Sequence, residues 1–201
     1  MGQTLTIGTR NRGKLTEMSQ LLDELGVDIF PLSVNIAEIE ETGATFAENA
    51  ILKASGYARQ SGSYVLADDS GLSIAALDGR PGVNSARYAG TDLPFSAKMA
   101  ALLSELDATS SNDRRAWFTC SLAFASPAGK ILSTADGVCH GSIAAAASGS
   151  GGFGYDPIFV PDGYDQTFAE LPESEKAKIS HRAHACRQII PSLQDVFAKL
   201  T

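Results

Sequence analysis

The chain has 201 residues, of which 44% are hydrophobic and 19% are charged. This composition is typical of a globular protein with one large domain or two lobes around a common core, and it excludes a disordered chain. The formal net charge of −7 argues against nucleic acid as a partner, because duplex binding depends on Lys and Arg contacts to phosphate. No apolar run has the length of a membrane span and no secretory signal opens the sequence, so we expect no membrane partner.

The three cysteines, Cys120, Cys139 and Cys186, lie far apart and form no Cys-x-x-Cys pair. An odd and sparse count of this kind predicts reduced structural thiols. Because thiols stay reduced in the cytosol, the cysteines favour a cytoplasmic location over an oxidising compartment.

The first motif is a basic loop with glycines near both ends, Gly8–Lys14. It follows an apolar run and precedes a helical pattern, and such a unit binds phosphate through backbone N–H groups and the helix dipole. The spacing fits G-x-x-x-x-G-K, but Leu15 stands where a P-loop has Ser or Thr to hold Mg²⁺. We therefore expect a phosphate-binding loop whose metal is held elsewhere; an ordinary turn with solvated basic side chains is the alternative.

The first half of the chain alternates helical and extended patterns. Leu and Met recur at helical spacing over Leu15–Leu25, and Gly26 supplies a stop. Val27–Leu32 then reads as a strand. Thr45–Glu48 resembles a capping box that opens the next helix, and Tyr64–Ala67 reads as a short buried strand. We expect the buried face of the capped helix to be formed by Ala50, Ile51, Ala54 and Tyr57.

The second half adds a hairpin between two helical segments. Pro94–Leu106 has a helical pattern, whereas 116–124 alternates side chains as a strand does and is followed by a turn and a second strand over Ile131–His140. Ser180 caps a last helix, which Pro191 is expected to kink or restart. Because helices and strands alternate while the hairpin is antiparallel, we predict an α/β fold with a mixed sheet.

Two adjacent aspartates, Asp68 and Asp69, follow the strand at Tyr64–Ala67 and are expected at its C-terminal end. In open α/β sheets ligands collect at that edge. Neighbouring residues of an extended segment point to opposite sides, so one carboxylate should face a cleft and the other should accept bonds from backbone N–H groups. A carboxylate at this edge can hold Mg²⁺ or act as a general base toward water. Capping of the next segment is the alternative.

Three glutamates are further candidates for a metal site. Glu48 has a sufficient explanation as the capping-box partner of Thr45, and Glu40 and Glu41 can be solvated loop charges. Mg²⁺ takes only one or two protein carboxylates in many sites, and nothing local distinguishes these residues.

Two later segments can contact a planar, anionic ligand. Gly149–Pro157 places Phe153 between glycines, where the ring can stack on a base; a mobile surface loop is the alternative. Lys176, His181 and Arg182 place cations near a helix start, which is unfavourable for the helix dipole but useful where an anion binds.

Taken together, six segments resemble the inosine triphosphate pyrophosphatase family, also called dITP/XTP pyrophosphatases. Each segment is weak alone, but six in this order are specific, and the resemblance covers essentially the whole chain. The segments are T-R-N-R-G-K at Thr9–Lys14, E-E-T-G-A-T-F-A-E-N-A-I-L-K-A at Glu40–Ala54, A-D-D-S-G-L at Ala67–Leu72, P-G-V-N-S-A-R-Y-A-G at Pro81–Gly90, G-G-F-G-Y-D-P-I-F at Gly151–Phe159 and S-H-R at Ser180–Arg182.

The resemblance implies an elongated α/β fold: a single domain over 1–201 with two lobes around a long mixed sheet, flanking helices, an active cleft between the lobes, and a homodimer. It implies Mg²⁺-dependent hydrolysis of ITP, dITP and XTP to the monophosphate and pyrophosphate. The partner is then a purine nucleotide. A P-loop-like NTPase that releases orthophosphate, and a nucleotide-binding module without turnover, are the alternatives; Leu15 argues against the first and the Asp68–Asp69 pair against the second.

The same resemblance implies roles for individual residues. Asp69 would be the general base and a metal ligand together with Glu40, and Ser70 would contact the substrate. The phosphates would be bound by Thr9, Arg10, Asn11, Arg12, Gly13 and Lys14. The base pocket would be formed by Phe153, Gly154, Tyr155, Asp156, Lys176, His181 and Arg182. The chain departs from the family at Arg10, where a small residue is usual, and at Asn84, where an aromatic or aliphatic residue is usual.

Overall fold

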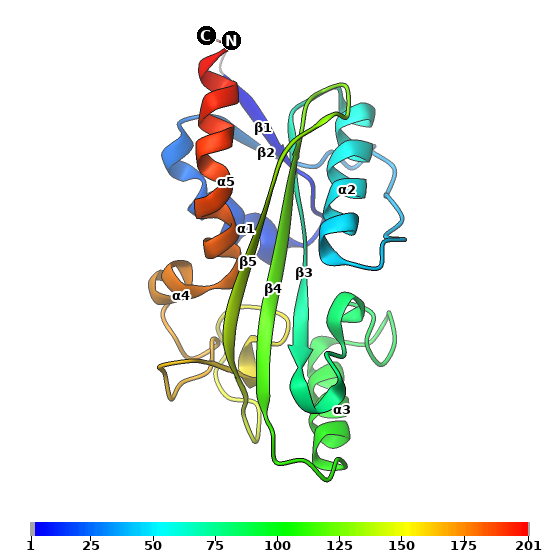
Figure 1. Cartoon of the computed structure of the whole chain (residues 1–201), viewed down its shortest axis with the longest axis vertical. Coiled ribbons are helices and arrows are strands. Elements are labelled where there is room, and N and C mark those ends of the chain that lie inside the picture. The colour runs from blue at the N-terminus through cyan, green and yellow to red at the C-terminus, as the bar shows by residue number, and fades with distance from the viewer. Residues whose placement is uncertain (1–2, 201) are drawn as a thin grey trace. The chain divides into compact units, whose positions relative to one another are not determined.

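The computed structural model describes residues 3–200 and shows an α/β protein with a six-stranded sheet (Figure 1). The strands are β1 Thr4–Ile7, β2 Asp28–Pro31, β3 Val65–Ile74, β4 Arg115–Ala125, β5 Ile131–Ile143 and β6 Phe159–Pro161. The helices are α1 Arg12–Leu21, α2 Phe46–Ser61, α3 Phe95–Asp107, α4 Glu173–Ile179 and α5 His181–Ala198.

The sheet has the strand order β2-β1-β3-β4-β5-β6. Strand β1 pairs in parallel with both β2 and β3, whereas β5 pairs antiparallel with β6. Strands β4 and β5 are neighbours joined by a short turn, in which Ser126 N donates to Lys130 O at 2.9 Å. The predicted α/β class, the mixed sheet and the hairpin are therefore confirmed.

The described chain divides into two compact units. Unit 1 contains residues 3–69, 120–137 and 181–200, and unit 2 contains residues 70–119 and 138–180. The division falls inside β3, β4 and β5, so each of these strands contributes residues to both units. Each unit has a hydrophobic core of its own.

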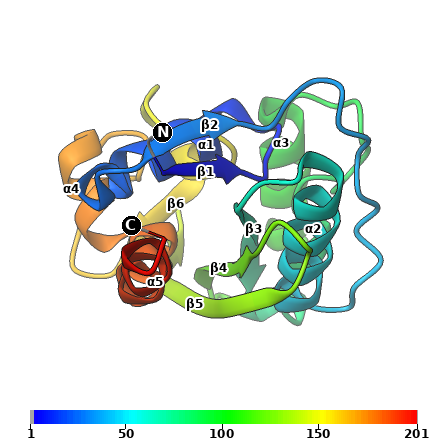
Figure 2. The same cartoon turned by 90° about the horizontal axis from the view of Figure 1, so that it is seen from above.

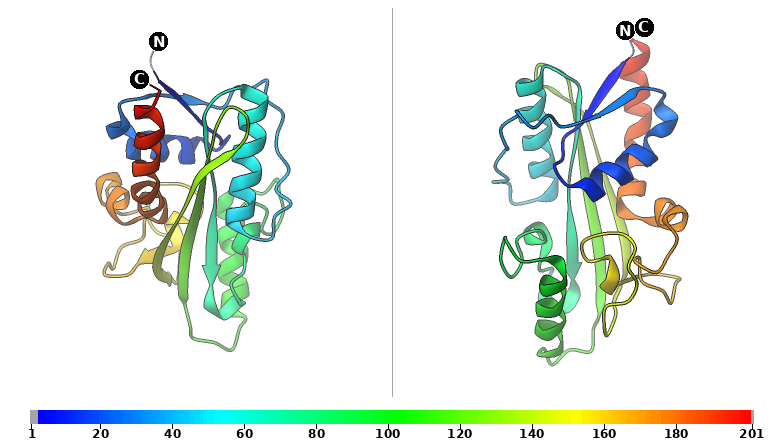
Figure 3. Two further views of the ribbon diagram at one scale, coloured as in Figure 1. Left: turned by 45° about the horizontal axis from the view of Figure 1, so that its top comes forward. Right: turned by 180° about the vertical axis from the view of Figure 1, so that it is seen from behind.

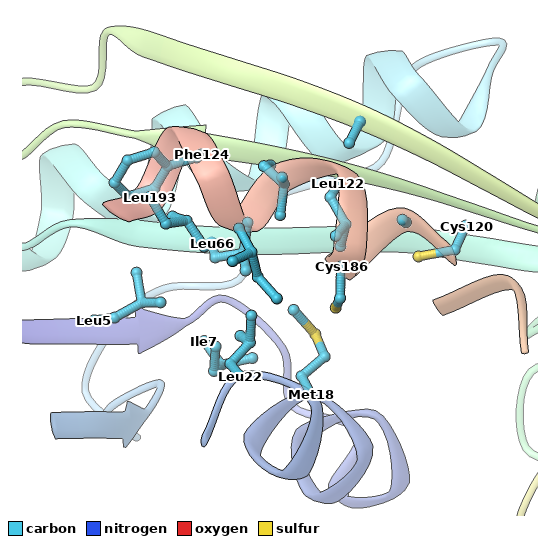
Figure 4. Packing of buried hydrophobic residues seen from close by; sticks show 14 of the residues in the cluster. Leu5, Ile7, Met18, Leu22, Leu66, Cys120, Leu122, Phe124, Cys186 and Leu193 are labelled. Atoms are coloured by element: carbon cyan, nitrogen blue, oxygen red, sulfur yellow. The ribbon is translucent and has the colours of Figure 1, made fainter. Parts of the chain in front are cut away.

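In unit 1 the two faces of β3 are covered by different helices (Figure 2). Leu66 packs in a cluster with α1 and α5, which lie beside each other in Figure 3, and Figure 4 shows this cluster from close by. Val65 and Ala67 pack instead against α2. Because side chains alternate along a strand, Asp68 shares the face of Leu66 and Asp69 shares the face of Val65 and Ala67.

The core of unit 2 contains three stacked and edge-on phenylalanine rings. The ring centroid of Phe159 lies 4.7 Å from that of Phe118 and 5.1 Å from that of Phe168. Helix α3 adds Met99 and Leu102 to the same cluster. Aromatic pairs at these separations stabilise a core beyond the area that they bury.

Several element predictions can be compared with the structure in detail. The capping box is confirmed, since the Thr45 side chain accepts a bond from Glu48 N and the Glu48 side chain accepts one from Thr45 N. The predicted end of the strand at Ala67 is wrong: β3 runs on to Ile74. Asp68 and Asp69 therefore lie inside a buried strand and not at its end.

A prediction about the buried face of α2 is also wrong. Ile51 is 36% exposed, because the buried face of α2 is rotated toward Asn49 and Lys53. Of the two outcomes expected at Pro191, a restart is excluded because α5 continues through this residue, and a kink stays a prediction. The three cysteines are buried free thiols, as expected. Within residues 3–200, no helix has both the length and the apolar character that a membrane span requires.

Gly137 allows the backbone of α5 to lie close to β5 within unit 1. A Cβ at this position would lie 2.1 Å from His181 O and 2.4 Å from Ala185 N. Both neighbours are backbone atoms, so the helix would have to shift. We expect Gly137→Ala to lower the free energy of unfolding by about 1–3 kcal/mol, as overpacking does.

Urea unfolding followed by circular dichroism measures this change. Thr134→Ala, on the exposed side of the same strand, is the matched control and should change the stability by less than about 1 kcal/mol. Equal stability of Gly137→Ala and the wild type would contradict the close approach of α5 to β5.

Candidate active site

The loop between β1 and α1 is fixed by side-chain and backbone contacts. Asn11 caps α1, and its Oδ1 accepts a hydrogen bond from Lys14 N at 3.1 Å. Asn11 N in turn donates to Thr9 Oγ1 at 3.2 Å. A Cβ on Gly8 would lie 2.9 Å from the Cβ of Ala67, so only glycine fits where the loop leaves β1. The predicted strand–loop–helix geometry is therefore present.

The basic residues of this loop differ in what they contact. Arg10, exposed, donates to the carbonyl oxygen of Ile36. Arg12 and Gly13 form the first turn of α1, where the Arg12 side chain is exposed. Lys14 is mostly buried, with 14% of its side chain exposed, and points at a carboxylate. Among the basic residues of this loop, Lys14 is thus the one whose side chain is held by an ion pair with β3, through Asp68.

Asp68 lies among cations on the face of β3 that packs against α1 and α5. Its Oδ2 is 3.0 Å from Lys14 Nζ and 3.5 Å from a guanidinium nitrogen of Arg182. Asp68 and Arg182 are each 1% exposed, and Arg182 also forms an ion pair with Glu17. Burial alone would raise the pKa of Asp68, but Lys14 and Arg182 lower it well below its usual value. Asp68 therefore remains ionised at neutral pH.

Asp69 points to the opposite face of β3, toward α2, as the alternation of the strand predicts. Asn49 Nδ2 donates to Asp69 Oδ2 at 3.1 Å. Lys53 Nζ lies 3.2 Å from Asp69 Oδ1 and 2.6 Å from Glu41 Oε1, so one ammonium group joins two carboxylates. We call Glu41, Asn49, Lys53 and Asp69 the α2-side cluster.

Burial is the largest single influence on the pKa values of Asp69 and Lys53, but the two residues shift for different net reasons. Burial raises the pKa of Asp69, and the nearby Lys53 and Lys14 offset only part of this effect. Burial would lower the pKa of Lys53, but the carboxylates around it, with Asp69 first, raise it above its usual value. A buried carboxylate of raised pKa is a stronger base toward a bound water than an exposed aspartate is.

Asn49 connects Asp69 to the loop that carries Glu41. It is fully buried, and its Oδ1 accepts a hydrogen bond from Gly43 N at 2.8 Å. A Cβ on Gly43 would lie 2.7 Å from that same oxygen, so the loop can approach Asn49 only with glycine at this position. The amide of Asn49 thus uses one end for the loop and the other end for the aspartate.

The three candidate glutamates are now distinguished. Glu41 is joined to Asp69 through Lys53. Glu40 is exposed, and Glu48 is occupied in the capping box, where Oε2 accepts from Thr45 N at 3.2 Å. Glu41 is the glutamate that the contacts place with Asp69.

The α2-side cluster suits a hard divalent cation. Glu41 and Asp69 offer the carboxylate oxygens that Mg²⁺ prefers, and they already share one cationic group, the Lys53 ammonium. Within residues 3–200 there is no set of three or more His, Cys, Asp or Glu side chains arranged to hold a metal. Two carboxylates are enough for Mg²⁺ when water and substrate phosphate complete its coordination.

Unit 2 holds a second candidate cluster, formed by Phe153, Asp156 and Lys176. Asp156 Oδ2 accepts hydrogen bonds from Phe153 N at 2.7 Å and from Lys176 Nζ at 2.5 Å. The same Nζ lies 4.9 Å from the centroid of the Phe153 ring. Asp156 is 3% exposed and Lys176 6%, so this is a buried ion pair beside a half-buried aromatic ring.

The other predicted base-pocket residues are placed as follows. Tyr155 is buried and its hydroxyl donates to Ser85 O at 2.9 Å, so this side chain supports the fold of unit 2. Gly154 has a φ of +67°, which favours glycine. Ser70 is half-buried in the unit 2 part of β3. His181, in unit 1, is buried at the start of α5.

The sequence profile of the Ham1 family matches residues 5–192. The chain belongs to the Ham1 family. It is 46% identical over 186 residues to a Bacillus licheniformis protein named dITP/XTP pyrophosphatase. The aligned residues make up 91% of this chain and 94% of that protein. A Rhodospirillum centenum protein of the same name is 47% identical over 194 residues, 94% of each chain.

A solved HAM1 protein from Coxiella burnetii has the same fold as this Ham1 chain. The two superpose with a TM-score of 0.87 and are 41% identical, over 96% of this chain and 99% of that chain. The family resemblance inferred from the six segments is thereby confirmed.

Sequence reasoning missed two residues of the α2-side cluster in this Ham1 protein, Asn49 and Lys53. Both lie on the buried face of α2 among Ala50, Ala54 and Tyr57. Their spacing of four residues puts them on the same side of the helix, where polar groups are costly unless they have partners. An Asn and a Lys on an otherwise apolar helical face are thus the signal that could have identified them.

Asp68 gives the unfolding of this Ham1 protein an acid dependence. Its pKa is lowered in the folded chain, so the stability that it contributes is present above about pH 4, the unfolded value, and is lost as the pH falls below it. Asp68→Asn leaves Lys14 and Arg182 without this buried partner. We expect it to lower the free energy of unfolding at pH 7 by about 3–5 kcal/mol and to flatten its decrease below pH 4.

Urea unfolding of the metal-free protein between pH 3 and pH 7 measures both effects. Asp92→Asn, at an exposed position, is the control and should follow the wild type. An unchanged pH profile in Asp68→Asn would mean that the cations around Asp68 do not stabilise its ionised form.

Proposed function

We propose that this Ham1 protein hydrolyses purine nucleoside triphosphates of the ITP, dITP and XTP class to the monophosphate and pyrophosphate. The observation that carries the proposal is the buried carboxylate of Asp69, held by Asn49 and Lys53 on the strand next to the β1–α1 loop. The names of the curated relatives, dITP/XTP pyrophosphatase, support the substrate class.

The β1–α1 loop would bind the phosphates. The N-terminus of α1 offers backbone N–H groups and the positive end of the helix dipole, and Lys14 adds a full charge. Thr9, Arg10 and Arg12 are the other loop side chains that can contact phosphate oxygens. Asn11 would act mainly through its cap on α1, since its Oδ1 is already bonded to Lys14 N.

A divalent cation, most simply Mg²⁺, would be held by Asp69 and a glutamate. Glu41 has the contacts for this role, and Glu40, which the resemblance suggested, is the second candidate. The ion pairs form two groups: Glu17, Asp68, Lys14 and Arg182 have a net charge of zero, and Glu41, Asp69 and Lys53 have a net charge of −1 when all are ionised. Bound Mg²⁺ would supply the positive charge that a polyanionic substrate needs.

In the chemical step Asp69 would accept a proton from the attacking water. The water oxygen forms a bond to the α phosphorus, the bond from that phosphorus to the bridging oxygen breaks, and pyrophosphate leaves with the bonding electrons. Asn49 would keep the Asp69 carboxylate in one orientation while this happens. Asp68, with its lowered pKa, would remain ionised and hold Lys14 and Arg182 in place. We therefore assign the buried Arg182 to supporting Asp68, in place of direct contact with the base.

The purine ring would be recognised by residues of unit 2. The Phe153 ring offers a face for stacking, and the Lys176 ammonium, held by Asp156, offers donors to a 6-keto oxygen. A 6-amino purine would place its N–H donors against the Lys176 ammonium, which cannot accept a hydrogen bond. Its binding free energy would therefore be weaker by about 1–3 kcal/mol. Gly154 and Tyr155 would shape this region through the backbone. Roles for Ser70 and His181 in binding, the homodimer and the cytoplasmic location stay predictions from the sequence.

Product analysis tests the proposal. Wild-type protein is incubated with Mg²⁺ and matched concentrations of ITP, XTP, ATP or GTP. We expect pyrophosphate with IMP or XMP, slow turnover of ATP and GTP, and loss of activity when EDTA removes the metal. Orthophosphate from ATP would favour the P-loop-like NTPase, and nucleotide binding without any product would favour the non-hydrolysing module.

Asp69→Asn tests the assignment of the base. The amide cannot accept the proton of the attacking water, so we expect kcat for ITP to fall by about 10²–10⁴-fold. The side chain keeps its size, and the circular dichroism spectrum and urea midpoint should remain close to those of the wild type. Asp165→Asn, at an exposed position, is the control. Near-normal turnover would remove Asp69 from the role of base.

A further inference from the structure

Within unit 2 the glycine-rich segment 148–152 is fastened to the turn at residues 167–170. Ser148 Oγ donates to Glu170 Oε1 at 2.5 Å, and Thr167 N donates to Glu170 Oε2 at 2.8 Å. Thr167 Oγ1 donates to Ser148 O at 2.9 Å, and Gly151 N donates to Ala169 O at 2.9 Å. We call these four bonds the Glu170 clamp.

The clamp requires glycine on one side. Gly149 has a φ of +84°, and a Cβ there would lie 2.5 Å from the carbonyl carbon of Ala169. A Cβ on Gly151 would lie 2.9 Å from Ala169 O. The two backbones are therefore in direct contact, and a glycine-rich segment, which has many conformations when unrestrained, is held in one of them.

The segment leads directly to Phe153. Immediately after the clamp, Phe153 N donates to Asp156 Oδ2 and the Phe153 ring lies against Lys176. On the other side of the clamp, Phe168 is 1% exposed in the core of unit 2. The clamp thus joins the chain on the N-terminal side of Phe153 to a turn that packs through Phe168 in the core of unit 2.

Glu170 takes part in two of the four bonds of the clamp. Each of its two carboxylate oxygens accepts a different donor, Ser148 Oγ and Thr167 N. These bonds lower its pKa below the usual value, with Ser148 the largest cause. Hydrogen bonds to an ionised acceptor are stronger than neutral ones.

We propose that Glu170 is a positioning residue for base recognition, which fixes segment 148–152 and thereby the place of the Phe153 ring. The proposal rests on the proposed function, in which Phe153 contacts the purine. Glu170 has no part in the phosphate chemistry that we assign to Asp69 and Lys14. Its loss should therefore weaken binding of the nucleoside part and leave the chemical step intact.

The test compares Glu170→Ala, Glu170→Gln and Ser148→Ala with the wild type, and Asp165→Ala is the control for removing a nearby exposed carboxylate. The measurements are KM and kcat for ITP with Mg²⁺, and the inhibition constant of inorganic tripolyphosphate, which has the phosphates but no base. We expect Glu170→Ala to raise KM about tenfold, as loss of a hydrogen bond to a charged group does. In this variant kcat and the tripolyphosphate constant should stay within about twofold of the wild type.

Glu170→Gln is the conservative variant that should restore the wild-type KM lost in Glu170→Ala. Its amide oxygen can accept from Thr167 N while its NH₂ group donates to Ser148 Oγ, so KM should return close to the wild-type value. An unchanged KM in Glu170→Ala would overturn the proposal. So would an equal rise in KM and in the tripolyphosphate constant, because that pattern indicates a general structural role.

The proposed function and the clamp can fail separately. If the wild type releases no pyrophosphate from ITP, the proposed function fails. The clamp is then judged by calorimetry, from the dissociation constants of ITP and of tripolyphosphate for the wild type and Glu170→Ala. If Glu170→Ala binds ITP more weakly than the wild type but binds tripolyphosphate equally well, the positioning role of Glu170 is supported. If the two proteins bind ITP with equal affinity, that role is overturned. If Glu170→Ala does not fold, the same comparison is made with Ser148→Ala.

Discussion

The alternation of side chains along β3 is the constraint on which the unit 1 site depends. It sends two consecutive carboxylates to opposite faces of one buried strand, where each meets a different helix and a different lysine. Asp68 is surrounded by cations and stays ionised, whereas Asp69 meets an amide and one ammonium group and is the more basic. Two chemically identical residues acquire different properties from the faces that they share with Lys14 and Lys53.

The charges around Asp68 and Asp69 nearly cancel, because four carboxylates are paired with three cations. Removing Asp68 would leave Lys14 and Arg182 without their shared buried partner, which costs more than the ion pairs themselves contribute. The same near-balance suits the proposed binding of a polyanion together with a divalent cation, because the site needs neither a strongly positive nor a strongly negative charge before they bind. The fully buried Asn49 adds a neutral link, which orients a carboxylate without changing the charge.

Much of the fold was predictable because its signals are local. The capping box at Thr45 and the hairpin depend on neighbouring residues, and the structure confirms them. The length of β3 was not predictable in this way: Ser70 and Gly71 are typical of turns, but pairing in the sheet keeps them extended. The choice of Glu41 over Glu40 likewise depends on how an irregular loop docks on Asn49, and no periodicity describes such a loop.

The continuity of β3 has a consequence for how this family can vary in length. In a surface loop an added residue is absorbed locally. Within residues 65–69 a single insertion or deletion would exchange the two faces of the strand, so the proposed base would enter the cationic surroundings of α1 and α5 while its neighbour moved to α2. Length changes are therefore expected to be confined to segments outside this stretch, and substitutions, never insertions, should account for its natural variation.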